Sequence, residues 1–92
     1  MAGARSIIVG QATVDATAGG TLIVPAQPGR AGVIIENLGT TDVYIGVSGV
    51  TTATGFLIPG TKGANVPVTF TGAIYGITGG GSATLAYWSE QP

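Results

Sequence analysis

Turn-forming residues interrupt this chain at regular intervals, and their spacing limits what it can fold into. Glycine, proline, asparagine or aspartate recurs in short clusters about every 8 to 12 residues, which is typical of a β-sandwich or barrel. The intervening segments are rich in valine, isoleucine and threonine, whose branched side chains favour strands. Because strong helix formers other than alanine are scarce, the sequence predicts an all-β protein with no helix longer than one turn.

The turns divide the chain into eight expected strands. These strands cover residues 6–14, 21–25, 30–37, 43–47, 55–58, 65–70, 73–78 and 82–89. We expect residues 38–42 and residues 79–81 to close hairpins between consecutive strands. Eight short antiparallel strands are the number found in a jelly roll, so we predict a single jelly-roll-like β-sandwich or barrel. Residues 7–92 would form this domain, preceded by a flexible N-terminal arm of residues 1–6.

Alternation of side chains along the strands separates an expected core face from an outer face. Pro67 marks an edge strand, because proline cannot donate a hydrogen bond to a neighbouring strand. The outer faces carry Ile34, Tyr44, Ala86 and Trp88, and no run of charges. The residues expected in the core are Val33, Ile35, Val43, Ile45, Val47, Phe56, Val66, Val68, Phe70, Ile74, Leu85 and Tyr87.

Charge is unusually low. The chain has three lysines and arginines against four aspartates and glutamates, and only 8% of its residues are charged, where about 25% is usual. Three scattered cations make no basic patch, so nucleic acid is not an expected partner. Apolar runs are too short for a bilayer-spanning helix or a signal peptide, so we expect no membrane association and no secretion. Uncharged outer faces instead predict a protein partner, most simply other copies of the chain.

Residues that commonly carry catalysis are missing. There is no histidine or cysteine, so we expect no imidazole base, thiolate, disulfide or zinc site, and no cofactor. Glu36 and Asp42 could form the carboxylate pair of a glycosidase. We interpret Glu36 instead as an outward strand residue and Asp42 as a turn residue that bonds the local backbone. The sequence therefore predicts a protein that is not an enzyme.

Residues 55–62 (G-F-L-I-P-G-T-K) are similar to a phosphate-binding loop with one residue too many. The serine or threonine that should follow the lysine is Gly63, and Pro67 opposes the helix that such a loop requires. We interpret this match as accidental.

Three motifs carry a resemblance to a known class of proteins. They are I-E-N-L-G-T-T-D-V-Y-I-G at residues 35–46, G-F-L-I-P-G at residues 55–60, and I-Y-G-I-T at residues 74–78 followed by G-S-A-T. Over about residues 30–89, the chain resembles small virion proteins of tailed bacteriophages, among them capsid decoration (cement) proteins. The resemblance implies a β-rich homotrimer that binds the major capsid protein and stabilises the head. Its place would be the outer capsid surface, after synthesis in the host cytoplasm.

Two sets of contact residues follow from these expectations. The arm would bind the capsid through Ala2, Gly3, Ala4, Arg5 and Ser6. Self-association would involve Tyr44, Tyr75 and Trp88, with core packing as the alternative for these rings. The alternative function is a head-fibre, tail-fibre or receptor-binding module in which the same three rings contact host glycan. A third possibility is a carbohydrate-binding accessory domain of an enzyme.

Overall fold

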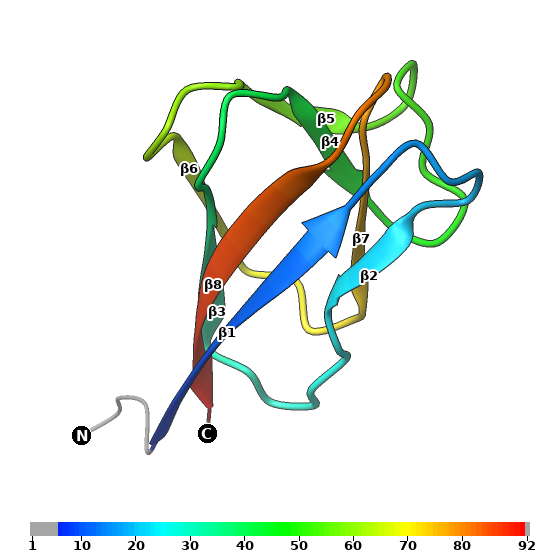
Figure 1. Cartoon of the computed structure of the whole chain (residues 1–92). Helices are drawn as coiled ribbons and strands as arrows, with labels where there is room; N and C mark the ends of the chain where they lie inside the picture. Colours follow the sequence, from blue (N-terminus) through cyan, green and yellow to red (C-terminus); the bar gives the residue numbers. More distant parts are fainter. Residues whose placement is uncertain (1–5, 92) are drawn as a thin grey trace.

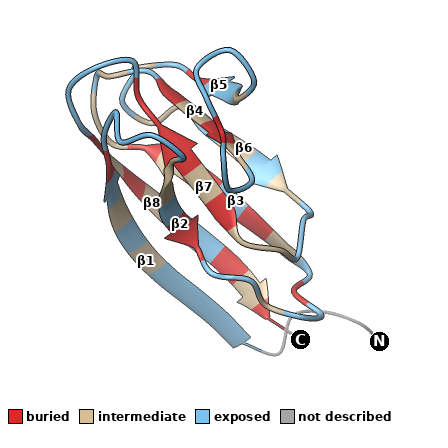
Figure 2. Cartoon of the chain, turned by 90° about the vertical axis from the view of Figure 1, so that its right-hand side faces the viewer, coloured by how far each residue is buried: buried red, intermediate tan, exposed pale blue. Residues whose placement is uncertain are grey.

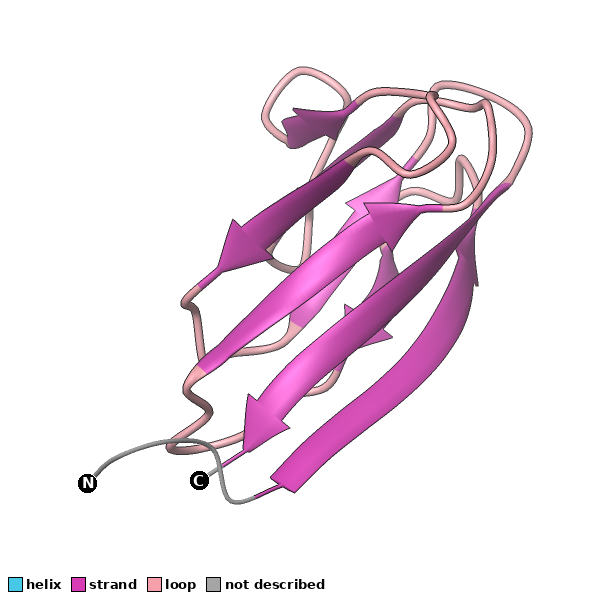
Figure 3. Cartoon of the chain, turned by 90° about the vertical axis from the view of Figure 1, so that its left-hand side faces the viewer, coloured by secondary structure: helices cyan, strands magenta, loops and turns pink. Residues whose placement is uncertain are grey.

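The computed structural model describes residues 6–91, which form eight β-strands and no helix (Figures 1 and 3). This confirms the all-β prediction and the number of strands. The strands are β1 (Ser6–Val14), β2 (Thr21–Val24), β3 (Gly32–Asn37), β4 (Val43–Gly46), β5 (Phe56–Ile58), β6 (Asn65–Val68), β7 (Ile74–Ile77) and β8 (Ala83–Gln91).

The strands form two antiparallel sheets of four strands each. Their orders are β1-β8-β3-β6 and β2-β7-β4-β5. Four of the pairings are nested along the chain, because β1 pairs with β8, β2 with β7, β3 with β6, and β4 with β5. The additional pairs β3–β8 and β4–β7 then complete each sheet.

The two predicted hairpins are wrong. Residues 38–42 join β3 to β4, and residues 79–81 join β7 to β8, but in each case the two strands belong to different sheets. Turn residues end a strand without specifying its partner. Here β3 pairs with β8, and β4 pairs with β7, although these strands are distant in sequence. Among consecutive strands, β4 and β5 are paired, although a longer loop joins them.

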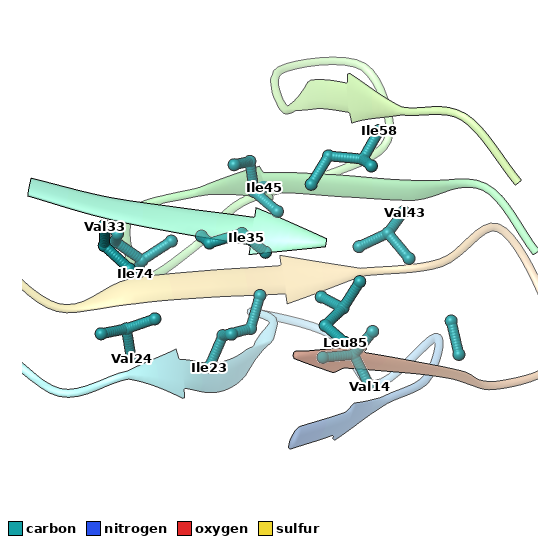
Figure 4. Close-up of a cluster of buried hydrophobic side chains, with 11 residues drawn as sticks. Val14, Ile23, Val24, Val33, Ile35, Val43, Ile45, Ile58, Ile74 and Leu85 are labelled. Carbon is teal, nitrogen blue, oxygen red and sulfur yellow. The ribbon is translucent and has the colours of Figure 1, made fainter. Parts of the chain in front are cut away.

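The core lies between the two sheets, and both sheets contribute to it (Figure 4). Alternation predicts its faces correctly in β3, where Val33 and Ile35 are buried while Ile34 between them is 44% exposed. Figure 2 shows the same alternation of buried and exposed residues along several strands. The buried apolar cluster consists of Val14, Ile23, Val24, Val33, Ile35, Val43, Ile45, Ile58, Ile74, Ala83 and Leu85, with Val66, Val68 and Tyr87 packed against it.

Three residues expected in the core are exposed instead. Val47 and Phe70 lie beyond the ends of β4 and β6, so the alternation of those strands does not reach them. Phe56 lies on β5, at the edge of its sheet, and is 62% exposed. The prediction that Pro67 marks an edge is confirmed, because β6 is the last strand of its sheet.

Candidate interaction surfaces

The side chains considered for catalysis or metal binding can be located in the described residues. Among residues 6–91, no three histidine, cysteine, aspartate or glutamate side chains are grouped so that they could hold a metal ion. No helix in that range could cross a membrane. Asp42 accepts a 2.6 Å hydrogen bond from the backbone N–H of Gly60, 18 residues away, so its partner is not local as expected. Glu36 is half-buried on β3, where it lies opposite Asn65 of β6 and Ala86 of β8 in the strand register.

Asn37 is a buried polar residue that sequence reasoning missed. Its side-chain amide donates to the carbonyl oxygens of Thr41, at 2.8 Å, and Pro59, at 3.2 Å. Its side-chain oxygen accepts a 2.9 Å hydrogen bond from the N–H of Gly39. Asn37 is 0% exposed, so these bonds satisfy a side chain that water does not reach.

The contacts of Asn37 and Asp42 connect two of the motifs on which the virion resemblance rests. Residues 37–42 lie against the Pro59–Gly60 turn, and a Cβ added to Gly60 would collide with the backbone of Thr40. Asn37, Asp42 and Gly60 therefore hold the β3–β4 connection against the β5–β6 connection. Their role here is architectural, and the signal that could have found Asn37 was its place at the start of the N-L-G-T-T-D turn.

Arg30 is a second buried polar residue, noted in the sequence only as one of three cations. Its guanidinium donates hydrogen bonds to the carbonyl oxygens of Pro25 at 2.8 Å, Phe70 at 2.7 Å and Gly72 at 2.8 Å. Desolvation by burial lowers the pKa of Arg30. Its hydrogen bonds connect the β2–β3 and β6–β7 segments, so we assign Arg30 to the scaffold.

An apolar stripe crosses the outer face of the β1-β8-β3-β6 sheet. Cross-strand pairing places Val9 beside Trp88, Trp88 beside Ile34, and Ile34 beside Pro67. Val9 is 65% exposed, and Trp88 and Ile34 are each 44% exposed. The indole N–H of Trp88 donates a 3.3 Å hydrogen bond to Glu90, which orients the ring. Trp88 is thus an outer-face residue, and its alternative role in the core is wrong.

A groove of about 450 Å³ lies on the same face, and Val9 and Ile34 of the stripe form part of its lining. The neighbouring cross-strand row is Gln11, Ala86 and Glu36, so a short alanine side chain lies between an amide and a carboxylate. Trp88 also lines the groove. The groove therefore combines an aromatic ring with two hydrogen-bonding side chains.

A second groove, of about 410 Å³, opens at the side of the molecule where β6 of one sheet approaches β4 and β5 of the other. Phe56 and Phe70, the two phenylalanines expected in the core, both line it. Its lining is almost entirely apolar and consists of Ile45, Gly46, Val47, Phe56, Val66, Pro67, Val68, Phe70 and Ile74.

Tyr44 and Tyr75 lie on the outer face of the other sheet, on the opposite side of the molecule from Trp88. Both are half-buried, and the loop between β4 and β5 packs close to them. Val50 of this loop is only 4% exposed and forms a β-bridge with Gly19. The three aromatic residues expected in self-association therefore do not form one surface.

The predicted capsid-binding arm can be located only at its end. Ala2, Gly3, Ala4 and Arg5 lie outside the described residues. Ser6 is exposed and is the first residue of β1, where it pairs with Gln91.

Comparison with protein families, curated proteins and solved structures finds no match for this chain. The chain is therefore classified here by its fold and its surfaces. It is a small two-sheet β-protein with little charge and an exposed apolar stripe across one sheet.

Proposed function

We propose that this chain is a structural protein of a tailed-phage virion. In this proposal it is a decoration (cement) protein that binds the outside of the major capsid protein lattice and stabilises the head. The observation that carries the proposal is the uncharged stripe of Val9, Trp88, Ile34 and Pro67, because a monomer rarely leaves such a surface uncovered. The sequence motifs that resemble virion proteins suggest that the partner covering this stripe is a capsid protein.

The fold proposed for this role is a jelly roll. Nested pairing of the first strand with the last, the second with the seventh, and so on inwards supports it. An eight-stranded jelly roll divides such strands between two packed sheets, as the orders β1-β8-β3-β6 and β2-β7-β4-β5 do here. This arrangement leaves the outer face of the β1-β8-β3-β6 sheet available for contacts.

Stabilisation of the head would follow from mass action. A protein that binds the assembled lattice, and not its separated subunits, shifts the equilibrium towards the lattice by RT ln(1 + [L]/Kd). Many copies bound across neighbouring subunits would require many contacts to break together. Since the stripe is uncharged, attachment should weaken only slightly as salt concentration rises.

The test compares phage heads that carry this protein with heads that lack it. Heads with the protein should withstand a higher temperature before they release DNA. A Trp88→Asp variant should attach more weakly, because a carboxylate would be buried in an apolar contact. Leu57→Asp is the matched control, since Leu57 is also 44% exposed but lies on the other sheet. Equal heat resistance of the two kinds of head would refute the stabilising role.

The arm is tested separately by deleting residues 1–5. This deletion keeps Ser6 in its pairing with Gln91, so the fold should be retained. We expect lower occupancy on heads at limiting protein concentration. Unchanged occupancy would exclude the arm as a capsid contact, while leaving the decoration role open.

The groove beside Trp88 favours a second candidate function, a receptor-binding module that recognises host glycan. An indole face can stack on a sugar ring, and Gln11 and Glu36 could bond its hydroxyl groups. Glycan-array binding that is lost in both Trp88→Ala and Gln11→Ala would support this function. Binding to heads without any glycan binding would favour decoration.

A further inference from the structure

The four sheet edges of this molecule are protected very unequally. Strand β6 has four residues and contains Pro67, β5 has three residues, and β2 has four residues with a register shift between Leu22 and Val24. Shortness, proline and bulges all interrupt the row of free N–H and C=O groups that another strand would need. These three edges are therefore poor templates for pairing.

The fourth edge, β1, has none of these protections. It runs for nine residues, Ser6–Val14, in unbroken register with β8, and it contains no proline and no charged residue. Natural edge strands of this length usually carry a charge, a proline or a bulge that prevents association. Among the four edges, β1 alone could pair over a long distance.

The side chains of β1 are also exposed on both of its faces. Ile7 and Val9, on the outer face, are 49% and 65% exposed. Ile8 points to the inner face and is nevertheless 48% exposed. Figure 2 shows β1 exposed along most of its length at one side of the molecule. A further strand beside β1 would cover apolar surface on both faces at once.

We propose that β1 is a self-pairing edge through which two copies of this chain form one continuous sheet. The order across the pair would be β6-β3-β8-β1 followed by β1-β8-β3-β6 of the second copy. Antiparallel pairing of a strand with its own copy is two-fold symmetric, so each copy offers the other the same row of donors and acceptors. The absence of charge on β1 removes the repulsion that would otherwise arise between identical strands.

The length of β1 defines a register for this pairing. If all nine residues take part, Gly10 lies opposite Gly10 of the second copy, and Val9 lies opposite Gln11 of the second copy. Gly10, at the two-fold axis, makes room for the Tyr87 ring of its own chain, which a Cβ at this position would meet. The apolar stripes of the two copies then lie on the same face of the joined sheet.

The inference is independent of the proposed virion role. Pairing through β1 closes at two copies, so it predicts a dimer of twice 9.0 kDa and not the homotrimer implied by the resemblance. Sedimentation equilibrium of the full chain at tens of micromolar distinguishes these assemblies. A monomer or a trimer would overturn the inference.

Charge substitutions test the surface and the register together. The double variant Val9→Lys/Gln11→Lys would place lysines directly opposite one another at two points, and we expect at least about tenfold weaker dimerisation. Mixing it with Val9→Glu/Gln11→Glu should restore a mixed dimer. Leu57→Lys, on the exposed edge strand β5, is the control and should leave the dimer unchanged.

Circular dichroism would establish that each variant keeps its β-structure. A folded lysine variant that dimerises as tightly as the parent chain would overturn the inference. So would a mixture of lysine and glutamate variants that fails to associate.

Discussion

Replacement of Asn37 by alanine should destabilise this protein more than any surface substitution. The change leaves three backbone groups without their partner, namely the carbonyl oxygens of Thr41 and Pro59 and the N–H of Gly39. Each lost hydrogen bond contributes about 1 kcal/mol, so the free energy of unfolding should fall by about 3 kcal/mol. A domain of this size has about 5–15 kcal/mol in total and loses about 4–8 °C in melting temperature per kcal/mol. We therefore expect a decrease of about 12–24 °C.

Thermal denaturation followed by circular dichroism measures this decrease. Asn65→Ala is the matched control, because the exposed Asn65 amide makes a single 3.1 Å hydrogen bond to Gly63. That change should cost less than about 0.5 kcal/mol. A melting temperature of Asn37→Ala within about 3 °C of the parent value would refute the reasoning. It would mean that water replaces the lost amide.

Asn37→Asp tests the direction of the hydrogen bonds. The carboxylate could still accept from Gly39, but it would meet the carbonyl oxygens of Thr41 and Pro59 without a proton to donate. Burial beside two acceptors should raise the pKa of the new carboxyl in the folded state. The destabilisation should therefore be largest at neutral pH and should decrease as pH falls through that raised value.

Substitutions at three further sites probe the rest of the scaffold. Arg30→Met should lower the melting temperature by at least about 12–24 °C, since three hydrogen bonds to carbonyl oxygens of at least about 1 kcal/mol each are lost, and Arg30→Lys should recover part of it. Gly76→Ala would place a Cβ 2.7 Å from the end of Ile23, and chemical denaturation should show a loss of about 1–3 kcal/mol from overpacking. Hydrogen bonds from the Thr17 side chain and backbone lower the pKa of Asp15. Its stabilisation is present above its unfolded pKa of about 3.9 and is lost as pH falls through the lowered folded value, so Asp15→Asn should flatten an acid-unfolding curve there.

Local chemistry was enough to predict much of the fold. Glycine and proline clusters separated the eight strands, and alternation in β3 correctly predicted that Val33 and Ile35 face the core while Ile34 faces outwards. Pro67 indicated an edge strand, because the missing N–H is a property of that one residue. The low charge was likewise evident from composition alone. Each of these features depends on a residue and its immediate neighbours.

Strand partners and surfaces required the tertiary structure. The pairing of β1 with β8 joins residues as distant as Ser6 and Gln91, and no local signal distinguishes it from a hairpin between consecutive strands. For the same reason, sequence could not place Tyr44 and Trp88 on opposite sides of the molecule.

The buried polar residues show the same limit. Arg30 and Asn37 look like ordinary surface residues in the sequence, because both types are mostly exposed in proteins. They are buried here because carbonyl oxygens from distant turns converge on them, from Phe70 and Gly72 on Arg30 and from Pro59 on Asn37. Alternation along a strand repeats every two residues and is visible in sequence, whereas such convergence exists only after the chain has closed on itself.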